Sequence, residues 1–175
     1  MLIAAIETST IAVSVALADA DGLVARFDAP RARRHAETVL PAIDAVLTLV
    51  GRTRCEITHM CVDVGPGMFT GLRVGVTTAI TLAMAFDLPV VSVGSLDLLA
   101  WQVALGGAHL GTVGAVLDAR RKECFVQPFA VTPGEAPIPL APASAMPPSS
   151  AAEVLRQHGC ARLIGDGAVD RKSVV

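Results

Sequence analysis

Residues 61–87 read CVDVGPGMFTGLRVGVTTAITLAMAFD, and this stretch decides the fold. It opens with a short, mostly apolar run, which the turn Gly65-Pro66-Gly67 stops. A helix is expected next, with Thr70 as its N-cap. Gly71 and Gly75 lie four residues apart, so one flank of that helix carries no side chains and permits close approach of another backbone. The stretch therefore predicts a strand, a sharp turn and a helix that packs tightly.

The glycine turn has two interpretations. Backbone N–H groups at the start of a helix can bind an anion, so a phosphate could lie there. Alternatively, the glycines only let the strand and the helix pack closely. Arg73 is the one basic residue in the stretch, and no Gly-Lys-Ser or Gly-Lys-Thr sequence follows as in a P-loop. Tight packing is the favoured interpretation.

The amino-acid composition disfavours several classes of function. At 175 residues with 53% hydrophobic and only 17% charged residues, the chain can build one large or two small domains and should present apolar surface to a partner. A net charge of −2 and 3% aromatic residues disfavour direct binding to nucleic acid. The four cysteines form no C-x-x-C pair, which disfavours a disulfide framework or a zinc site.

The sequence predicts a cytoplasmic protein. Its longest weakly polar run, residues 74–86, is shorter than the roughly 20 residues that cross a bilayer, and several threonines interrupt it. Residues 1–6 lack the basic region of a signal peptide and resemble a first strand. We therefore expect neither a transmembrane helix nor a signal peptide.

The first half predicts a compact lobe over residues 1–106. Residues 2–6, 12–17 and 23–28 have the pattern of three antiparallel strands. A helix follows over residues 35–50, despite a proline at position 41. After the central strand and helix we expect a buried parallel strand at 90–93 and a helix at 96–105 capped by Ser95, with a boundary at Gly106-Gly107.

The second half, residues 107–175, predicts a partial repeat of the first. Residues 113–117 and 123–131 are strands around a polar turn, as at the start of the chain. Seven of the 11 prolines lie in residues 128–148, so this segment should be neither a central strand nor a helix. A short helix capped by Ser150 and a last strand at 161–164 complete the lobe.

Four motifs stand out along the chain. They are Glu7-Thr8-Ser9-Thr10 with Ser14-Val15-Ala16-Leu17, His35-Ala36-Glu37 followed by Leu40-Pro41-Ala42-Ile43-Asp44, the run GPGMFTGLRVG at 65–75, and Asp118-Ala119-Arg120. Together they resemble one family, the bacterial tRNA threonylcarbamoyladenosine biosynthesis proteins of the TsaB (YeaZ-like, glycoprotease-related) type. The resemblance covers residues 2 to about 126, and two positions depart from it: Met68 replaces a usual Ser, and Phe125 a frequent Tyr.

The resemblance implies a fold and a function. The fold is the α/β actin-like ATPase (ribonuclease H-like) type, with two βββαβαβα lobes of which the second is shortened. The function is that of a non-catalytic partner of the ligase TsaD, which modifies adenosine 37 of tRNAs that read ANN codons, with the ATPase TsaE joining the complex. Contact with tRNA would come only through that complex.

The two long helices are the expected partner surface, because both are more apolar than one sheet can cover. They could form a four-helix seam with TsaD or, in its absence, with a second copy in a homodimer. The alternative is that both helices are simply core. The predicted partner-binding residues are Ala36, Val39, Leu40, Ile43, Leu72, Val76, Ala79 and Ala83.

Two enzymatic alternatives stay open. One is an ATP-dependent, sugar-kinase-like enzyme. Its nucleotide and Mg²⁺ would be held by two turns, which we call the first turn (residues 7–10) and the second turn (residues 118–121). The residues involved would be Glu7, Thr8, Ser9 and Asp118. Neither turn has the glycines that wrap a phosphate, so we expect at most a vestigial nucleotide site and no required cofactor.

A metallopeptidase related to the glycoproteases would need two histidines on one helical face and a carboxylate. The four histidines, His35, His59, His109 and His158, are isolated in sequence. No catalytic residue and no metal site are predicted.

Overall fold

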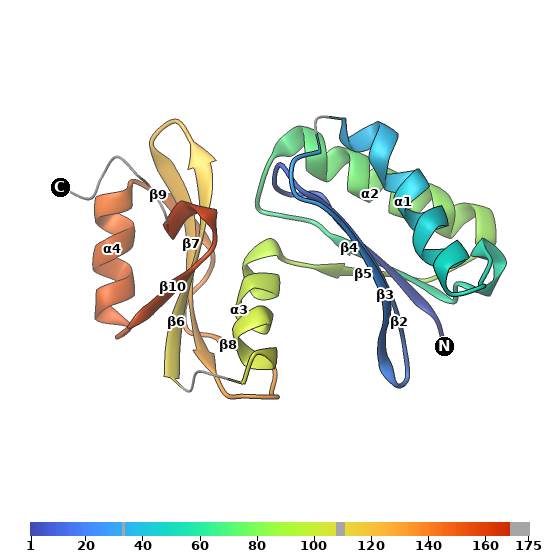
Figure 1. Ribbon diagram of the computed structural model, residues 1–175. Helices are drawn as coiled ribbons and strands as arrows, with labels where there is room; N and C mark the ends of the chain where they lie inside the picture. The colour runs from blue at the N-terminus through green and yellow to red at the C-terminus, as the bar shows by residue number, and fades with distance from the viewer. Residues whose placement is uncertain (33, 108–110, 169–175) are drawn as a thin grey trace. The chain divides into compact units, whose positions relative to one another are not determined.

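The computed structural model describes residues 1–32, 34–107 and 111–168 (Figure 1). The chain packs as two units, Met1–Val93 and Gly94–Val175, each with its own sheet.

The first unit is a five-stranded sheet covered by two helices. Its elements are β1 (Ile3–Glu7), β2 (Val13–Asp19), β3 (Gly22–Ala29), α1 (His35–Leu49), the 3-10 turn η1 (Arg54–Glu56), β4 (His59–Asp63), α2 (Phe69–Phe86) and β5 (Val90–Val93). The strand order is β3-β2-β1-β4-β5. The first three strands are antiparallel, as predicted, and β4 and β5 run parallel to β1.

Burial alternates along these strands, which is the pattern of a sheet with one face in the core. Figure 1 shows α1 and α2 side by side on the same face of this sheet. Val15 of β2, Met60 of β4, Val39 of α1 and Ala79 of α2 meet in one buried cluster. The core of the unit therefore lies between the sheet and the two helices.

The second unit repeats part of this topology. Its elements are α3 (Ser95–Leu105), β6 (Gly111–Arg120), β7 (Glu123–Val131), β8 (Ile138–Pro139), β9 (Ser144–Met146), α4 (Pro148–Gln157), β10 (Arg162–Ile164) and the 3-10 turn η2 (Asp166–Ala168). The order β10-β6-β7-β8, with β10 parallel and β7 antiparallel to β6, corresponds to β4-β1-β2-β3. Within the described residues the repeat ends at β10, and the shortening of the second lobe stays a prediction.

The predicted boundary at residue 107 differs from the one that the packing shows. Helix α3 belongs to the second unit, because Leu96 and Ala100 pack with Val113 of β6 and Phe129 of β7. Helix α4 packs on the other set of β6 and β7 side chains, through Ala151 and Leu155. The glycine pair after α3 is a loop within the second unit and not a joint between units.

Strand β5 is parallel, as predicted, but it is not buried. Val90 and Val91 are both exposed, because β5 is the edge strand and has only β4 beside it. A run of β-branched residues therefore indicates a strand here without indicating its place in the sheet.

The prediction that prolines exclude a central strand is wrong at Pro128. This residue lies inside β7, which pairs with β6 on one side and with β8 and β9 on the other. In an antiparallel ladder the N–H and C=O of one residue point to the same neighbour. The Pro128 carbonyl accepts from the backbone N–H of Leu140 at 2.9 Å, so its missing N–H falls on the side where β8 ends and β9 has not begun.

The predicted N-caps are also wrong. Helix α2 begins after Met68, α3 after Gly94 and α4 after Pro147, and none of these positions has a side-chain cap. At α2 a tertiary bond replaces the cap, because the Met68 N–H donates to the carbonyl of Ser9 at 2.6 Å. Thr70 lies inside the helix and is exposed.

Candidate functional site

The turn after β1 is bonded directly to the glycine flank of α2. The Thr8 hydroxyl is buried and donates to the carbonyl oxygen of Gly71 at 2.9 Å. A Cβ on Gly71 would overlap the Thr8 carbonyl oxygen, and a Cβ on Gly75 would overlap the Thr8 hydroxyl. The glycines therefore serve close backbone packing, as the favoured interpretation predicted.

The same turn occupies the space before α2. A Cβ on Gly67 would overlap the backbone and side chain of Ser9, whose carbonyl also accepts the Met68 N–H. A backbone N–H that could meet a phosphate at this helix start is thus already bonded to protein.

Glu7, at the end of β1, stabilises the same turn through hydrogen bonds to Ser9. Its Oε1 accepts from both the backbone N–H and the hydroxyl of Ser9, each at 2.6 Å. Burial raises the pKa of the Glu7 carboxyl, the Ser9 hydrogen bonds lower it, and the neighbouring Asp63 carboxylate raises it further. Asp63 itself is buried and accepts from the Gly65 N–H at 2.8 Å. Both acids are structural partners of turns.

Asp118, the fourth residue of the expected nucleotide site, lies in the second unit and stabilises its own turn. Its carboxylate accepts from the Arg120 N–H at 2.8 Å, and its N–H donates to Asp166 at 3.0 Å. The turn that follows has Arg120, Arg121 and Lys122 at φ values of 65°, 52° and 67°. Glu7, Thr8 and Ser9 lie in the first unit, and nucleotide binding by either group stays a prediction.

Three of the histidines have separate partners. His35 Nε2 lies 2.9 Å from the Thr10 carbonyl, His59 Nδ1 lies 2.9 Å from the Thr58 hydroxyl, and His158 Nδ1 lies 2.9 Å from the Val154 carbonyl. His109 is outside the described residues. Across residues 1–32, 34–107 and 111–168, no group of three His, Cys, Asp or Glu side chains could hold a metal ion.

Half of the predicted partner-binding residues are core. Val39, Ile43, Ala79 and Ala83 are buried within the first unit, so they cannot contact a partner. The prediction was wrong there because both helices are apolar nearly all round, and the periodicity alone did not tell the sheet side from the outer side. Of the others, Ala36 and Leu40 are exposed, and Leu72 and Val76 are half-buried.

The apolar residues that α2 does expose lie on a different stripe, together with Arg73 and Thr77. We call it the outer stripe: Phe69, Arg73, Thr77, Ile80 and Met84. Phe69 is 71%, Ile80 46% and Met84 80% exposed. Spacings of three and four residues put these positions on one helical face, opposite Gly75. The position of the glycines could have predicted this stripe from the sequence. When the glycine flank packs on the sheet side, the bulky residues on the opposite side of the helix must face outward.

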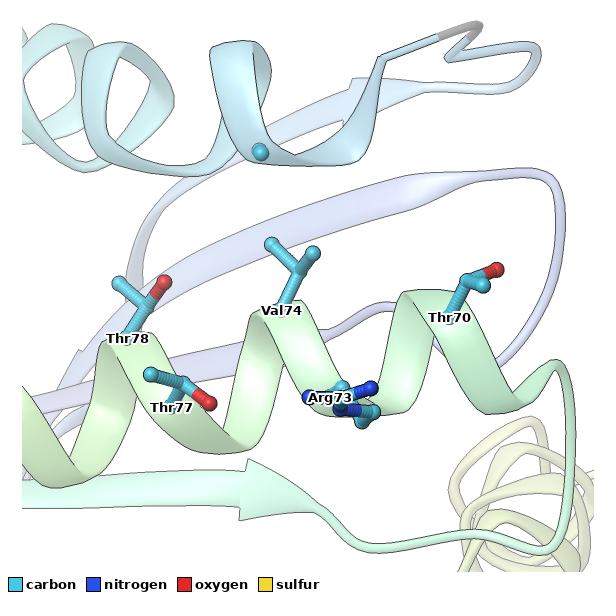
Figure 2. Close-up of a pocket in the computed structure, with 6 residues that line it drawn as sticks. Thr70, Arg73, Val74, Thr77 and Thr78 are labelled. Carbon is cyan, nitrogen blue, oxygen red and sulfur yellow. The ribbon is translucent and has the colours of Figure 1, made fainter.

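A groove of about 390 Å³ runs beside this stripe, between α1 and α2. It is lined by Ala36, Thr70, Arg73, Val74, Thr77 and Thr78. Figure 2 shows Thr70, Val74 and Thr78 pointing from α2 toward α1. Arg73 is exposed, and its guanidinium carbon lies 5.4 Å from the centre of the Phe69 ring. Hydroxyls and one cation thus lie within an otherwise apolar helix face.

Helix α2 has 18 residues and a mean hydropathy of 1.4, so by length and composition alone it could cross a membrane. Core helices of soluble proteins pass the same test. Only 28% of this helix is buried in the protein, and the buried part includes the glycine flank on its own sheet. The prediction that it does not span a membrane stays a prediction.

Known proteins share this architecture and sequence. The profile of the family described as "TsaD: tRNA N6-adenosine threonylcarbamoyltransferase" matches residues 27–136. A solved structure, YeaZ from Pseudomonas aeruginosa, superposes with a TM-score of 0.76 at 30% sequence identity, covering 84% of this chain and 68% of that chain. The chain is a TsaB/YeaZ-like member of this family. The resemblance and the fold predicted from the motifs are confirmed.

Curated relatives of this TsaB/YeaZ-like chain carry a functional name. The "tRNA threonylcarbamoyladenosine biosynthesis protein TsaB" of Bacillus subtilis (strain 168) is 33% identical over 126 residues, which are 71% of this chain and 53% of the relative. The TsaB of Escherichia coli (strain K12) is 37% identical over 125 residues, with the same two coverages, 71% and 53%. The chain spans about half the length of these relatives.

The glycine flank yields a stability prediction. Gly75→Ala should lower the free energy of unfolding by about 1–3 kcal/mol, because the new methyl group must displace the Thr8 hydroxyl and break its bond to Gly71. Ala85→Val, at an exposed position of the same helix, should change it by less than about 0.5 kcal/mol. Urea denaturation measures both variants, and equal stabilities would contradict the packing role.

The raised pKa of Glu7 yields a pH prediction. A carboxyl whose pKa is higher in the folded state stabilises the fold below its usual value of 4.5, and that contribution is lost as the pH rises through the raised value. Glu7→Gln keeps an acceptor for Ser9 and cannot ionise. The melting temperature of the variant relative to wild type should therefore increase between pH 4 and pH 7, and parallel pH curves would refute the shift.

Proposed function

We propose that this chain is the non-catalytic partner subunit of a TsaD-like ligase in the synthesis of N6-threonylcarbamoyladenosine at position 37 of tRNA. The observation that carries the proposal is the outer stripe of α2. An 18-residue apolar helix that exposes Phe69 and Met84 almost fully is the kind of surface that a second protein covers.

The docking geometry that we propose is a seam of helices. Helices α1 and α2 lie side by side on the sheet, and Leu40 on α1 adds exposed apolar area to the outer stripe. A pair of helices from the partner would pack against them. The partner is proposed from the names of the relatives, which refer to threonylcarbamoyladenosine synthesis and to the transferase TsaD.

The remaining parts of the proposal follow from this role. A TsaE-like ATPase would join the assembled pair, tRNA would be contacted through the complex, and the chain could form a homodimer when its partner is absent. The place of action would be the cytoplasm, where tRNA is modified.

The polar groups of the first turn support a non-catalytic role. The Thr8 hydroxyl, the Ser9 carbonyl and the Glu7 carboxylate are all hydrogen-bonded within the unit. A phosphate that used the Thr8 hydroxyl as a donor would have to break the bond between this turn and α2. The kinase-like alternative would need that rearrangement, so we propose that the chain requires no ATP, Mg²⁺ or other cofactor.

The outer stripe can be tested with one substitution. Met84→Glu should leave the monomer folded, because this side chain is 80% exposed, and should weaken binding to the TsaD-like subunit of the same organism by about 100-fold. The reason is that a charge would be buried without a partner at the seam. Isothermal titration calorimetry measures the affinity, and circular dichroism checks the fold.

The matched control is Leu105→Glu, which places the same charge on an equally exposed apolar position, 73% exposed, in the second unit. It should bind within about twofold of wild type. Equal losses in both variants, or none in Met84→Glu, would exclude the outer stripe as the docking surface.

The absence of a required nucleotide is tested by thermal shift. Adding millimolar ATP and Mg²⁺ to the isolated chain should leave its melting temperature unchanged, because a ligand raises the melting temperature only when it binds the folded state. A saturable increase, lost in Glu7→Gln, would favour the kinase-like alternative.

A further inference from the structure

The outer stripe contains one charge, and this charge has no counter-ion among the residues that the structure describes. Arg73 is the only charged residue in α2. In the part of the chain that the structure describes, six ion pairs form, and none includes Arg73. Its guanidinium lies over the exposed ring of Phe69, one turn earlier in the helix. The guanidinium therefore keeps its five N–H donors available for a ligand.

The surroundings of Arg73 are arranged for one planar acceptor. Phe69 lies under the guanidinium and restricts where it points, which lowers the entropy cost of binding. The groove beside it adds the hydroxyl-bearing residues Thr70, Thr77 and Thr78 (Figure 2). A carboxylate is the acceptor that a guanidinium pairs with in bidentate geometry, and nearby hydroxyls can donate to its remaining lone pairs.

Covering the outer stripe makes such an acceptor necessary. Arg73 lies between Phe69 and Ile80 along the stripe, so a helix that packs on these apolar residues also removes water from the guanidinium. Burying a charge without a partner is unfavourable and would offset much of the gain from burying the apolar residues. A partner that binds tightly here must therefore bring its own negative group.

We propose that the partner subunit inserts an Asp or Glu side chain from a helix into the groove between α1 and α2, where its carboxylate pairs with Arg73. The pair fixes the register of the two helices, because an apolar seam alone allows sliding by one turn. The inference rests on the proposed function and adds to it the group that the partner must carry.

A second copy of this chain is a poorer source of that carboxylate. Helix α2 has no acidic residue, and α1 has two. Glu37 is paired with Arg34 at 2.9 Å, and Asp44 with Arg54 at 2.6 Å. Each would have to leave an existing partner to reach Arg73. A nucleic-acid backbone is disfavoured as well, because it is bound by several cations together, and α2 carries one.

Substitutions at Arg73 test the pairing in the full chain with the TsaD-like subunit of the same organism. Calorimetry should show affinity reduced by about tenfold for Arg73→Gln and at least 100-fold for Arg73→Glu, in which two carboxylates would meet. Raising NaCl from 50 to 500 mM should weaken wild-type binding more than binding of Arg73→Gln, since the variant has lost the ion pair. Arg121→Gln, which removes an exposed and unpaired cation of the second unit, is the matched control and should bind like wild type.

The outcomes separate this inference from the proposed function. If the folded wild type fails to bind the subunit, the proposed function is overturned and the inference with it. If wild type and Arg73→Gln bind with equal affinity and equal salt dependence, only the inference is overturned. If the Arg73 variants change self-association in analytical ultracentrifugation and leave subunit binding unchanged, the occupant of the groove is a second copy, which also overturns the inference.

Discussion

The contact between Thr8 and the glycine flank of α2 is the constraint on which the first unit depends. It joins the end of the central strand β1 to a helix more than 60 residues later in the chain, through a buried hydrogen bond of 2.9 Å to Gly71. A buried hydrogen bond of this kind is specific, because either group alone would be costly to bury. It fixes both the distance of α2 from the sheet and its rotation about its own axis.

That rotation determines what the molecule presents to others. With Gly71 and Gly75 on the sheet, Phe69, Ile80 and Met84 can only point outward. The same contact engages the Thr8 hydroxyl and the Ser9 carbonyl of the first turn in hydrogen bonds to α2 and to the residue before it. The same contact therefore turns an apolar helix face outward and also engages polar groups of the first turn in hydrogen bonds. The proposal of a subunit that acts by association depends on these two features.

Much of the fold could be predicted from the sequence, because local patterns carry it. The three opening strands, the two long helices and the repeat of the opening topology follow from periodicity and turn residues. The predictions that were wrong concern where an element lies in the tertiary structure. Nothing local in Val90 and Val91 distinguishes an edge strand from a buried one, and the start of α2 is set by the carbonyl of Ser9 and not by a capping side chain. In the candidate site, Val39 and Ala79 were taken for surface because an all-round apolar helix has no self-evident inner side. The docking role of the exposed positions on the two helices stays a prediction.

Pro128 has a consequence for the solubility of the second unit. Because its nitrogen cannot donate, the strand outside β7 is split into β8, with two residues, and β9, with three. A continuous outer strand would offer a long row of free backbone groups on which another chain could add and aggregate. Two short pieces separated by a detour leave no such template, so a proline in the middle of a sheet protects this rim of the molecule against edge-to-edge polymerisation.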